Sequence, residues 1–220
     1  MLLLVCCTSL PAQNVVQHQR GEDLQQYLLD SVKFVVPEFQ AGIITFKDGG
    51  YSRGAVNIST IEQRVYFINP AGEYQVLVNE DEVTRVSIKG RSFLKSRYGY
   101  VELLQMLDGV TLGVVRRVSF QETEKTGAYG STSQTTSITT IGSIYGNGTT
   151  YTLDVDQNTP FKYKVIPYLY KDGRVLIPGK KSFQKCFPGK KAFIEAYVKD
   201  HSVDFEKMED VTALFEALKD

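Results

Sequence analysis

Between residues 34 and 120, apolar and polar residues alternate in short runs that are separated by turn sequences. Tyr74, Val76 and Val78 show the period of two that is typical of a strand with one buried face. Residues 47–50 (KDGG) and 69–72 (NPAG) have turn compositions, because Gly accepts positive φ and Pro fixes φ. Turns recur about every 8 to 12 residues, which predicts an antiparallel β-meander, closed as a barrel or folded as a sandwich.

The same pattern returns after a gap. Residues 161–170 are strand-like, residues 171–173 (KDG) form a turn, and residues 175–177 continue as a second strand before Pro178-Gly179 ends the β region. The predicted β domain therefore spans residues 34–179. No helix-length segment interrupts residues 34–120, which disfavours a parallel βαβ sheet.

The period changes to that of a helix at residues 180–220. Two apolar stripes at helical spacing lie there, made of Phe193, Ile194, Tyr197 and Val198 and of Val211, Leu214, Phe215 and Leu218. Ser182 is expected to cap a short turn before the first stripe. The stripes are expected to pack on the sheet or on each other, so the fold class is α+β, with a C-terminal helical subdomain after the meander.

Two segments fall outside this pattern. Residues 13–33 are polar and Gln-rich, and a short amphipathic helix is expected within them because Leu24, Leu28 and Val32 share a helical spacing. Residues 126–153 carry no charge and are dominated by Ser, Thr and Gly. A polar surface loop is expected there, and a protruding hairpin with a turn at Asn147-Gly148 is the alternative.

Residues 1–12 (MLLLVCCTSLPA) resemble a secretory leader, since a short apolar run ends in a small residue. The positively charged start of such leaders is missing, so the leader is expected to be truncated. It is too short to span a bilayer, which takes roughly 20 apolar residues, and no other apolar run is long enough. The expected location is the periplasm or the cell surface.

Charge and cysteine content narrow the list of partners. The chain has 25 basic and 25 acidic residues, so no global charge attracts nucleic acid or an anionic membrane. Residues 161–199 nevertheless hold ten basic against two acidic side chains, and residues 200–220 hold seven acidic against two basic. The two sets either neutralise each other or leave a basic face for anionic glycans or lipid headgroups. Without the leader, Cys186 is the only cysteine and is expected to face the core.

Motifs for catalysis or cofactor binding are absent from the sequence. It has no phosphate-binding loop, no dinucleotide fingerprint and no nucleophile elbow. Its only histidines are His18 and His201, too few for a typical His-based zinc site. Residues 154–158 (DVDQN) match the start of a calcium loop, but Thr159 replaces the required Gly and Val165 replaces the required Glu. We therefore predict no catalytic, cofactor-binding or metal residues and no cofactor.

A pair of carboxylates that hydrolyses glycosidic bonds remains an alternative, because that chemistry depends on the distance between the two groups, which the sequence does not give. The carboxylates on or beside predicted strands are Glu62, Glu73, Glu102 and Asp108.

Residues 39–102 resemble the core of exported β-rich proteins of unknown function from Gram-negative bacteria of gut and environmental habitats. Residues 180–218 are similar to the helical tail that such proteins often carry. The resemblance rests on turn glycines and apolar strands, and it implies bacterial export and an envelope location but no activity.

Together these observations predict a non-enzymatic interaction or ligand-binding module, whose partner is an envelope protein or a glycan rather than nucleic acid. The alternatives are a carbohydrate hydrolase that uses acidic residues, and a structural or assembly factor of the envelope.

Overall fold

The computed structural model describes residues 15–17, 28, 30–120 and 158–219. The leader expected at residues 1–12, most of the polar segment at 13–33 and the Ser/Thr/Gly-rich segment at 126–153 therefore lie outside the described residues. The same holds for residues 154–157 of the calcium-like run and for His18.

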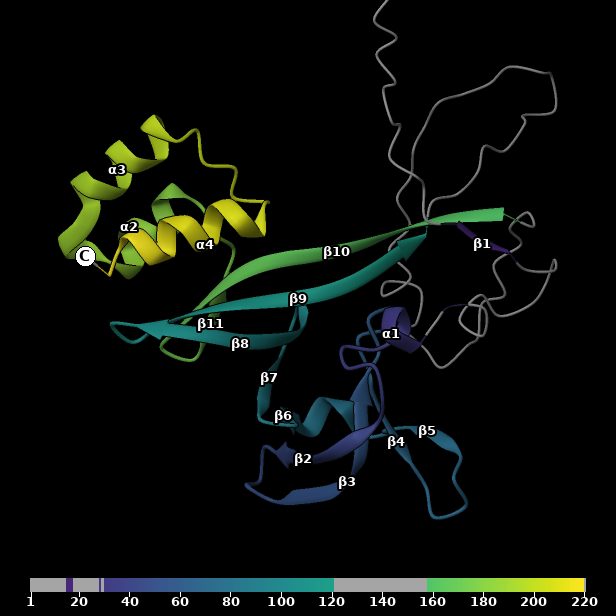
Figure 1. The fold of residues 1–220 in the computed structure, drawn as a ribbon. Helices are drawn as coiled ribbons and strands as arrows, with labels where there is room; N and C mark the ends of the chain where they lie inside the picture. Colours follow the sequence, from purple (N-terminus) through teal and green to yellow (C-terminus); the bar gives the residue numbers. More distant parts are fainter. Residues whose placement is uncertain (1–14, 18–27, 29, 121–157, 220) are drawn as a thin grey trace, which may run out of the picture. The chain divides into compact units, whose positions relative to one another are not determined.

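The described residues form an antiparallel sheet followed by helices (Figure 1). The strands are β1 (Val15–Gln17), β2 (Gln40–Phe46), β3 (Tyr51–Ile58), β4 (Val65–Ile68), β5 (Tyr74–Val76), β6 (Val83–Ile88), β7 (Arg91–Ser96), β8 (Gly99–Leu107), β9 (Val110–Phe120), β10 (Asn158–Lys171) and β11 (Arg174–Leu176). The helices are α1 (Asp30–Lys33), η2 (Glu80–Glu82), α2 (Lys180–Cys186), η4 (Pro188–Lys190), α3 (Lys191–Asp200) and α4 (Met208–Ala217). The predicted α+β class is confirmed.

Internal contacts divide the chain into two compact units. The smaller unit comprises Met1–Leu28 and Ser119–Lys162, and the larger unit comprises Leu29–Val118 and Tyr163–Asp220. In the smaller unit, β1 pairs with the start of β10, and the rings of Phe120 and Phe161 lie 6.5 Å apart.

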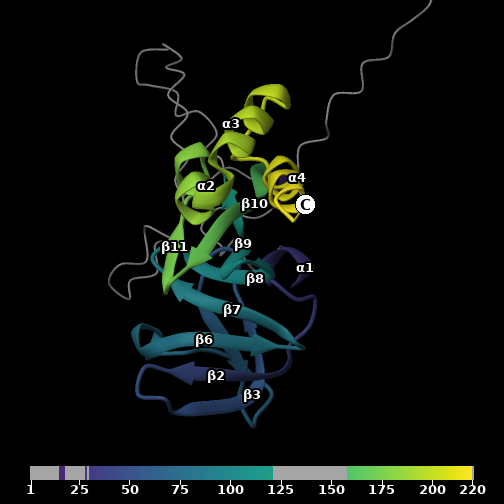
Figure 2. The same cartoon turned by 90° about the vertical axis from the view of Figure 1, so that its left-hand side faces the viewer.

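The pairing order is β1-β10-β9-β8-β7-β6-β2-β3-β4-β5, with β11 paired to β10 off this path. Two runs of consecutive hairpins, β2 to β5 and β6 to β9, make up the predicted meander. They join through β6, which pairs with β2 and not with β5, the strand that precedes it in the chain (Figure 2). The path has two ends, so among the described strands the meander is open and not closed into a barrel.

The larger unit has two main groups of buried apolar side chains. One group fills the space between strands β2 to β8 and includes Ile58, Val86, Ile88, Phe93 and Tyr100. The other joins the helices to β9 and β10: Leu112 and Leu169 share it with both predicted helical stripes, except Phe193, which is 42% exposed. The expected packing of the helices on the sheet is confirmed.

Cys186 and Ser182 both lie in helix α2, at the start of the helical part. Cys186 lies in the helical core, where it is 2% exposed, and burial raises the pKa of its thiol. The expected cap at Ser182 was wrong, because α2 already begins at Lys180. The Ser182 hydroxyl donates instead to the carbonyl oxygens of Ile177 and Gly179, each at 2.9 Å.

In the described part of the chain, no helix combines the length and the apolar character that crossing a membrane requires.

Candidate functional site

An open groove of about 740 Å³ lies in the larger unit, between strands β6 and β7 on one side and the β10–β11 hairpin on the other. The lining residues come from the β2–β3 turn, η2, both strand pairs and the turn that joins β7 to β8. They are Lys47, Asp81, Val83, Thr84, Leu94, Lys95, Ser96, Arg97, Tyr98, Tyr170, Gly173, Arg174, Val175 and Leu176.

Four cationic side chains line this groove against one carboxylate, Asp81. Two of the four have acidic partners: Lys95 lies 2.6 Å from Glu80, and exposed Lys47 lies 3.8 Å from Glu82. Arg97 and Arg174 are exposed, and neither takes part in an ion pair with any other described residue. The groove therefore presents uncompensated positive charge, which suits an anionic ligand.

The turn between β7 and β8 holds Arg97 in place. The Ser96 hydroxyl donates to the Gly99 carbonyl at 2.8 Å and accepts the Tyr98 amide at 3.1 Å, which closes the turn. The Arg97 guanidinium lies over the Tyr98 ring at 4.7 Å from its centroid and donates to the Tyr98 hydroxyl. The Tyr98 ring also packs against Tyr168, with ring centroids 4.9 Å apart. Stacking restricts the rotamers of Arg97 before any ligand arrives.

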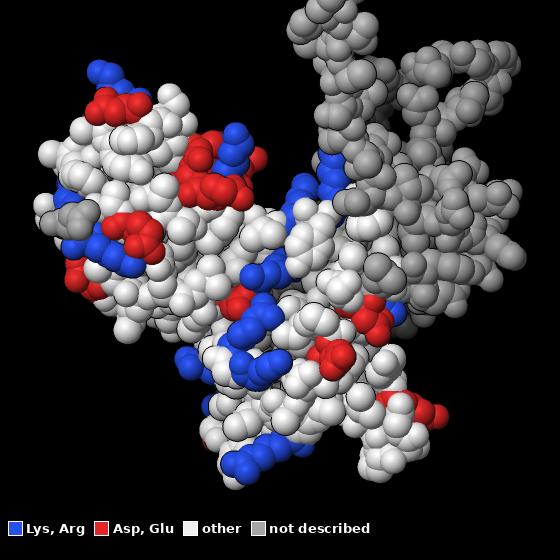
Figure 3. Space-filling view, viewed as in Figure 1, with Lys and Arg blue, Asp and Glu red and all other residues white. Residues whose placement is uncertain are grey.

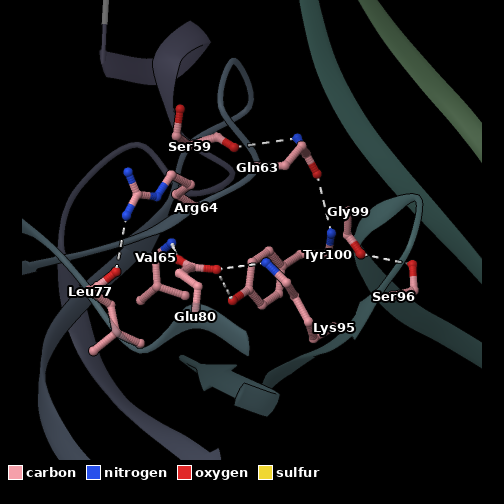
Figure 4. Close-up of polar contacts among 10 residues, drawn as sticks. All are labelled: Ser59, Gln63, Arg64, Val65, Leu77, Glu80, Lys95, Ser96, Gly99 and Tyr100. Carbon is pink, nitrogen blue, oxygen red and sulfur yellow. Dashed lines mark hydrogen bonds and ion pairs between the residues drawn. The ribbon is translucent and has the colours of Figure 1, made fainter. Parts of the chain in front are cut away.

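Beneath the groove, the Glu80 carboxylate organises a buried polar cluster (Figure 4). It accepts the Val65 backbone N–H, the Tyr100 hydroxyl at 2.8 Å and the Lys95 ammonium at 2.6 Å. Lys95 also lies over the Tyr100 ring, 4.5 Å from its centroid. Burial and the neighbouring Glu80 charge raise the pKa of Tyr100. The cluster ties η2 to β4, β7 and β8, and so fixes the wall of the groove.

A second anchor, the Gln63 side chain, joins the loop after β3 to the start of β8 (Figure 4). Its amide nitrogen donates to the carbonyls of Ser59, Thr60 and Arg116, and its oxygen accepts the Tyr100 amide at 3.2 Å. Gly99 leaves the space for this contact, since a Cβ there would lie 2.2 Å from the Gln63 side-chain oxygen.

Glu102 lies in a separate charged cluster on strands β7, β8 and β9. Arg91 binds it through two nitrogens at 2.5 and 2.9 Å, and Arg116 donates to it from β9. Burial lowers the pKa of both Arg91 and Arg116, and the neighbouring Arg91 charge lowers that of Arg116 further. In Figure 3, Lys and Arg side chains follow one another across the strands of the face shown, while the largest acidic group lies on the helical part.

The four carboxylates considered for hydrolysis have different surroundings. Glu102 is held by two arginines, Glu62 accepts the Tyr66 hydroxyl, and Glu73 accepts the Asn69 amide within a turn. Asp108 occupies the β8–β9 turn at a φ of 49°. None of the four lines the groove.

Metal-binding geometry is likewise missing from the described ranges, where no group of three or more His, Cys, Asp and Glu side chains is placed to hold an ion. His201 ends helix α3, stacked on Tyr197 with ring centroids 3.9 Å apart.

Sequence reasoning missed the residues that form the groove. Glu80 stands in an acidic run, residues 80–82, which has the composition of a solvated surface, yet its side chain is buried. Arg97 precedes Tyr98 and Gly99, and this Arg-Tyr-Gly sequence is the local feature that could have indicated a turn carrying an arginine. Arg174 was counted within the basic stretch at residues 161–199, but nothing in the sequence placed it in the same groove as Arg97.

The chain matches no protein-family model, and no curated protein or solved structure is significantly similar to it. The resemblance to exported β-rich proteins therefore stays a prediction.

Proposed function

We propose that this protein is an exported, non-enzymatic binding module that holds an anionic group of a glycan or of an envelope protein in the groove between β7 and the β10–β11 hairpin. The observation that carries the proposal is the pair Arg97 and Arg174, both exposed in one groove and both without an acidic partner among the described residues. Guanidinium groups bind carboxylates and sulfates through two parallel hydrogen bonds, which gives orientation as well as attraction.

The state of the buried carboxylates supports a binding role over hydrolysis. A general acid or base needs a free lone pair or proton in reach of the substrate. Glu80 already accepts three hydrogen bonds and Glu102 is held by two arginines. Engaged in this way, both carboxylates are suited to stabilising the fold, and the proposed module uses no cofactor.

The envelope location is part of the proposal and rests on the leader-like residues 1–12. Fractionation of the native host cells tests it directly. Recovery of processed protein from the periplasm or the cell surface supports export, and unprocessed protein in the cytosol overturns it.

Calorimetric titration tests the groove with three probes: a galacturonate disaccharide, a glutamate-rich peptide and the neutral disaccharide cellobiose. We expect saturable binding of at least one anionic probe. The double variant Arg97→Gln/Arg174→Gln should abolish it. The matched control Arg53→Gln/Lys89→Gln removes two exposed cations outside the groove and should bind as the wild type does.

The same titration can refute the proposal. Equal binding by the groove variant and the wild type, or a preference for cellobiose, contradicts an anionic ligand in this groove. Appearance of cleaved products in the reaction mixture would instead favour the hydrolase alternative.

An envelope assembly factor is the second candidate, and exposed apolar side chains favour it. Leu104 and Met106 on β8 and Val165 on β10 are 44%, 72% and 37% exposed, on the two strands that flank β9. A Met106→Glu variant should then lose a specific envelope partner while its groove still binds the anionic probe. Retention of that partner by the variant contradicts this role for β8.

A further inference from the structure

We propose that the ligand is a linear acidic polysaccharide, which lies along a track of three connected basic hollows that starts at the groove. This inference rests on the proposed function, because the groove supplies the first of the three hollows. It adds the class of ligand and the direction in which a chain extends.

Neighbouring hollows share lining residues, so they lie next to one another. A second hollow of about 410 Å³ shares Arg174 and Leu176 with the groove. A third hollow of about 390 Å³ shares Lys185 with the second. Figure 2 shows β7, β11 and α2 following one another along this side of the larger unit. The track thus leads from the sheet, past the hairpin, to the first helix of the helical subdomain.

Positive charge prevails along the whole track. Six cationic lining residues have no acidic partner among the described residues: Arg97, Lys171, Arg174, Lys181, Lys185 and Lys191. Two more, Lys47 and Lys95, pair with Glu82 and Glu80. The acidic lining residues are Asp81 and Asp172. A single anionic group needs only one such hollow, so the repetition of cations fits a ligand with charge repeated along its length.

The cations beyond the groove are available to a ligand. Lys181, Lys185 and Lys191 are exposed, and none of them forms an ion pair with another described residue. Their neighbour Lys180 lies outside the track and does pair with an acid, Glu195, at 3.1 Å. Lys171 donates to the Cys186 carbonyl at 2.7 Å, which fixes its ammonium at the second hollow and leaves its charge unneutralised.

The lining favours a polysaccharide over a single-stranded nucleic acid. Proteins that hold single strands stack successive bases on aromatic side chains. The groove has two aromatic lining residues, Tyr98, which already packs against Arg97 and Tyr168, and Tyr170, whereas the second and third hollows have none, so no row of aromatic rings follows the track. Carboxylates at every sugar unit require only cations at intervals, as the track provides.

Chain length is the decisive variable in the test. Full-length protein is titrated with di-, tetra- and octasaccharides of galacturonic acid, and with mannuronic acid oligomers as a second linkage type. We expect affinity to rise with length in at least one series. The triple variant Lys181→Gln/Lys185→Gln/Lys191→Gln should weaken octasaccharide binding by about tenfold and leave disaccharide binding unchanged.

A matched triple variant, Lys89→Gln/Lys164→Gln/Lys199→Gln, removes the same charge from exposed positions outside the three hollows and should retain the length dependence. Equal affinity for short and long oligomers, or equal losses in both triple variants, overturns the track while leaving the groove intact.

Binding of no oligomer of either series overturns the proposal of a polysaccharide ligand. Tighter binding of oligothymidylate than of an octasaccharide reassigns the track to nucleic acid. A different result would show that the proposed function itself is wrong: the Arg97→Gln/Arg174→Gln variant would then bind the disaccharide as well as the wild type does.

Discussion

The hydroxyl of Tyr100 donates to the carboxylate of Glu80 at 2.8 Å inside the larger unit, although the two residues belong to different elements. Tyr100 is 2% exposed and Glu80 is 9% exposed. This bond links η2, which leads into β6, to β8 on the far side of β7. It therefore braces η2 against β8, across the groove wall that β7 forms.

Removal of the Tyr100 hydroxyl tests this link. Tyr100→Phe leaves the buried Glu80 carboxylate one donor short, so we expect the free energy of unfolding to fall by about 1–3 kcal/mol. Urea denaturation followed by circular dichroism measures the change. Tyr74→Phe is the control, because Tyr74 is 57% exposed and should lose little. Equal stability of the two variants would show that the bond is dispensable.

Alkaline pH should destabilise the fold through the same tyrosine. Burial raises the pKa of Tyr100, so the folded protein keeps a proton that the unfolded chain loses near pH 10. The unfolded state then binds fewer protons, and stability falls by about 1.4 kcal/mol per pH unit above that value for this group. Tyr163 and Tyr168, whose pKa values burial also raises, act in the same direction. Urea midpoints from pH 8 upward measure how steeply stability falls with pH. This fall should be shallower in Tyr100→Phe than in the wild type. Identical slopes for the two proteins would contradict the role given to Tyr100.

The turn at Gly99 should tolerate no side chain. Its φ of 107° is unfavourable for L residues, and a Cβ would meet the Gln63 oxygen at 2.2 Å. We expect Gly99→Ala to cost about 2 kcal/mol or more, from backbone strain and the lost Gln63 contacts. Gly54→Ala on β3 is the matched control, because nothing lies within 4 Å of its Cβ position. Similar unfolding midpoints for both variants would refute the packing argument.

Local patterns predicted the elements well and their long-range order less well. The β-forming residues Val83, Val86 and Ile88 lie in β6, and all three side chains are buried. The alternating Tyr74 and Val78 are instead 57% and 87% exposed, so the period of two did not mark a buried face there. The pairing of β6 with β2 was not predicted, nor were the contacts of Glu80 with β4, β7 and β8. No period along the chain encodes such contacts, because each joins residues that are distant in sequence.

The groove was not predicted for the same reason, since it is formed by residues that are distant in sequence. Arg97 follows β7 and Arg174 begins β11, so they line one groove only when the sheet between them has formed. The basic excess at residues 161–199 did indicate where cations gather. It could not show which of them remain without an acidic partner, since Lys180 and Lys181 look alike in sequence and only Lys180 pairs with Glu195.

The Glu102 carboxylate lies between two arginines, Arg91 and Arg116. Glu102→Gln keeps the shape of the side chain but leaves Arg91 and Arg116 facing each other without the intervening negative charge. We expect a loss of about 2 kcal/mol, below the value for a fully buried pair because the arginine side chains are 30% and 24% exposed. Glu73→Gln in an exposed turn is the control, and urea denaturation at low and high salt is the measurement. High salt should reduce the difference by screening the repulsion between the arginines. Anionic probes should still bind in the groove, since Glu102 does not line it; loss of that binding in a folded Glu102→Gln protein would show that the two charged clusters are coupled.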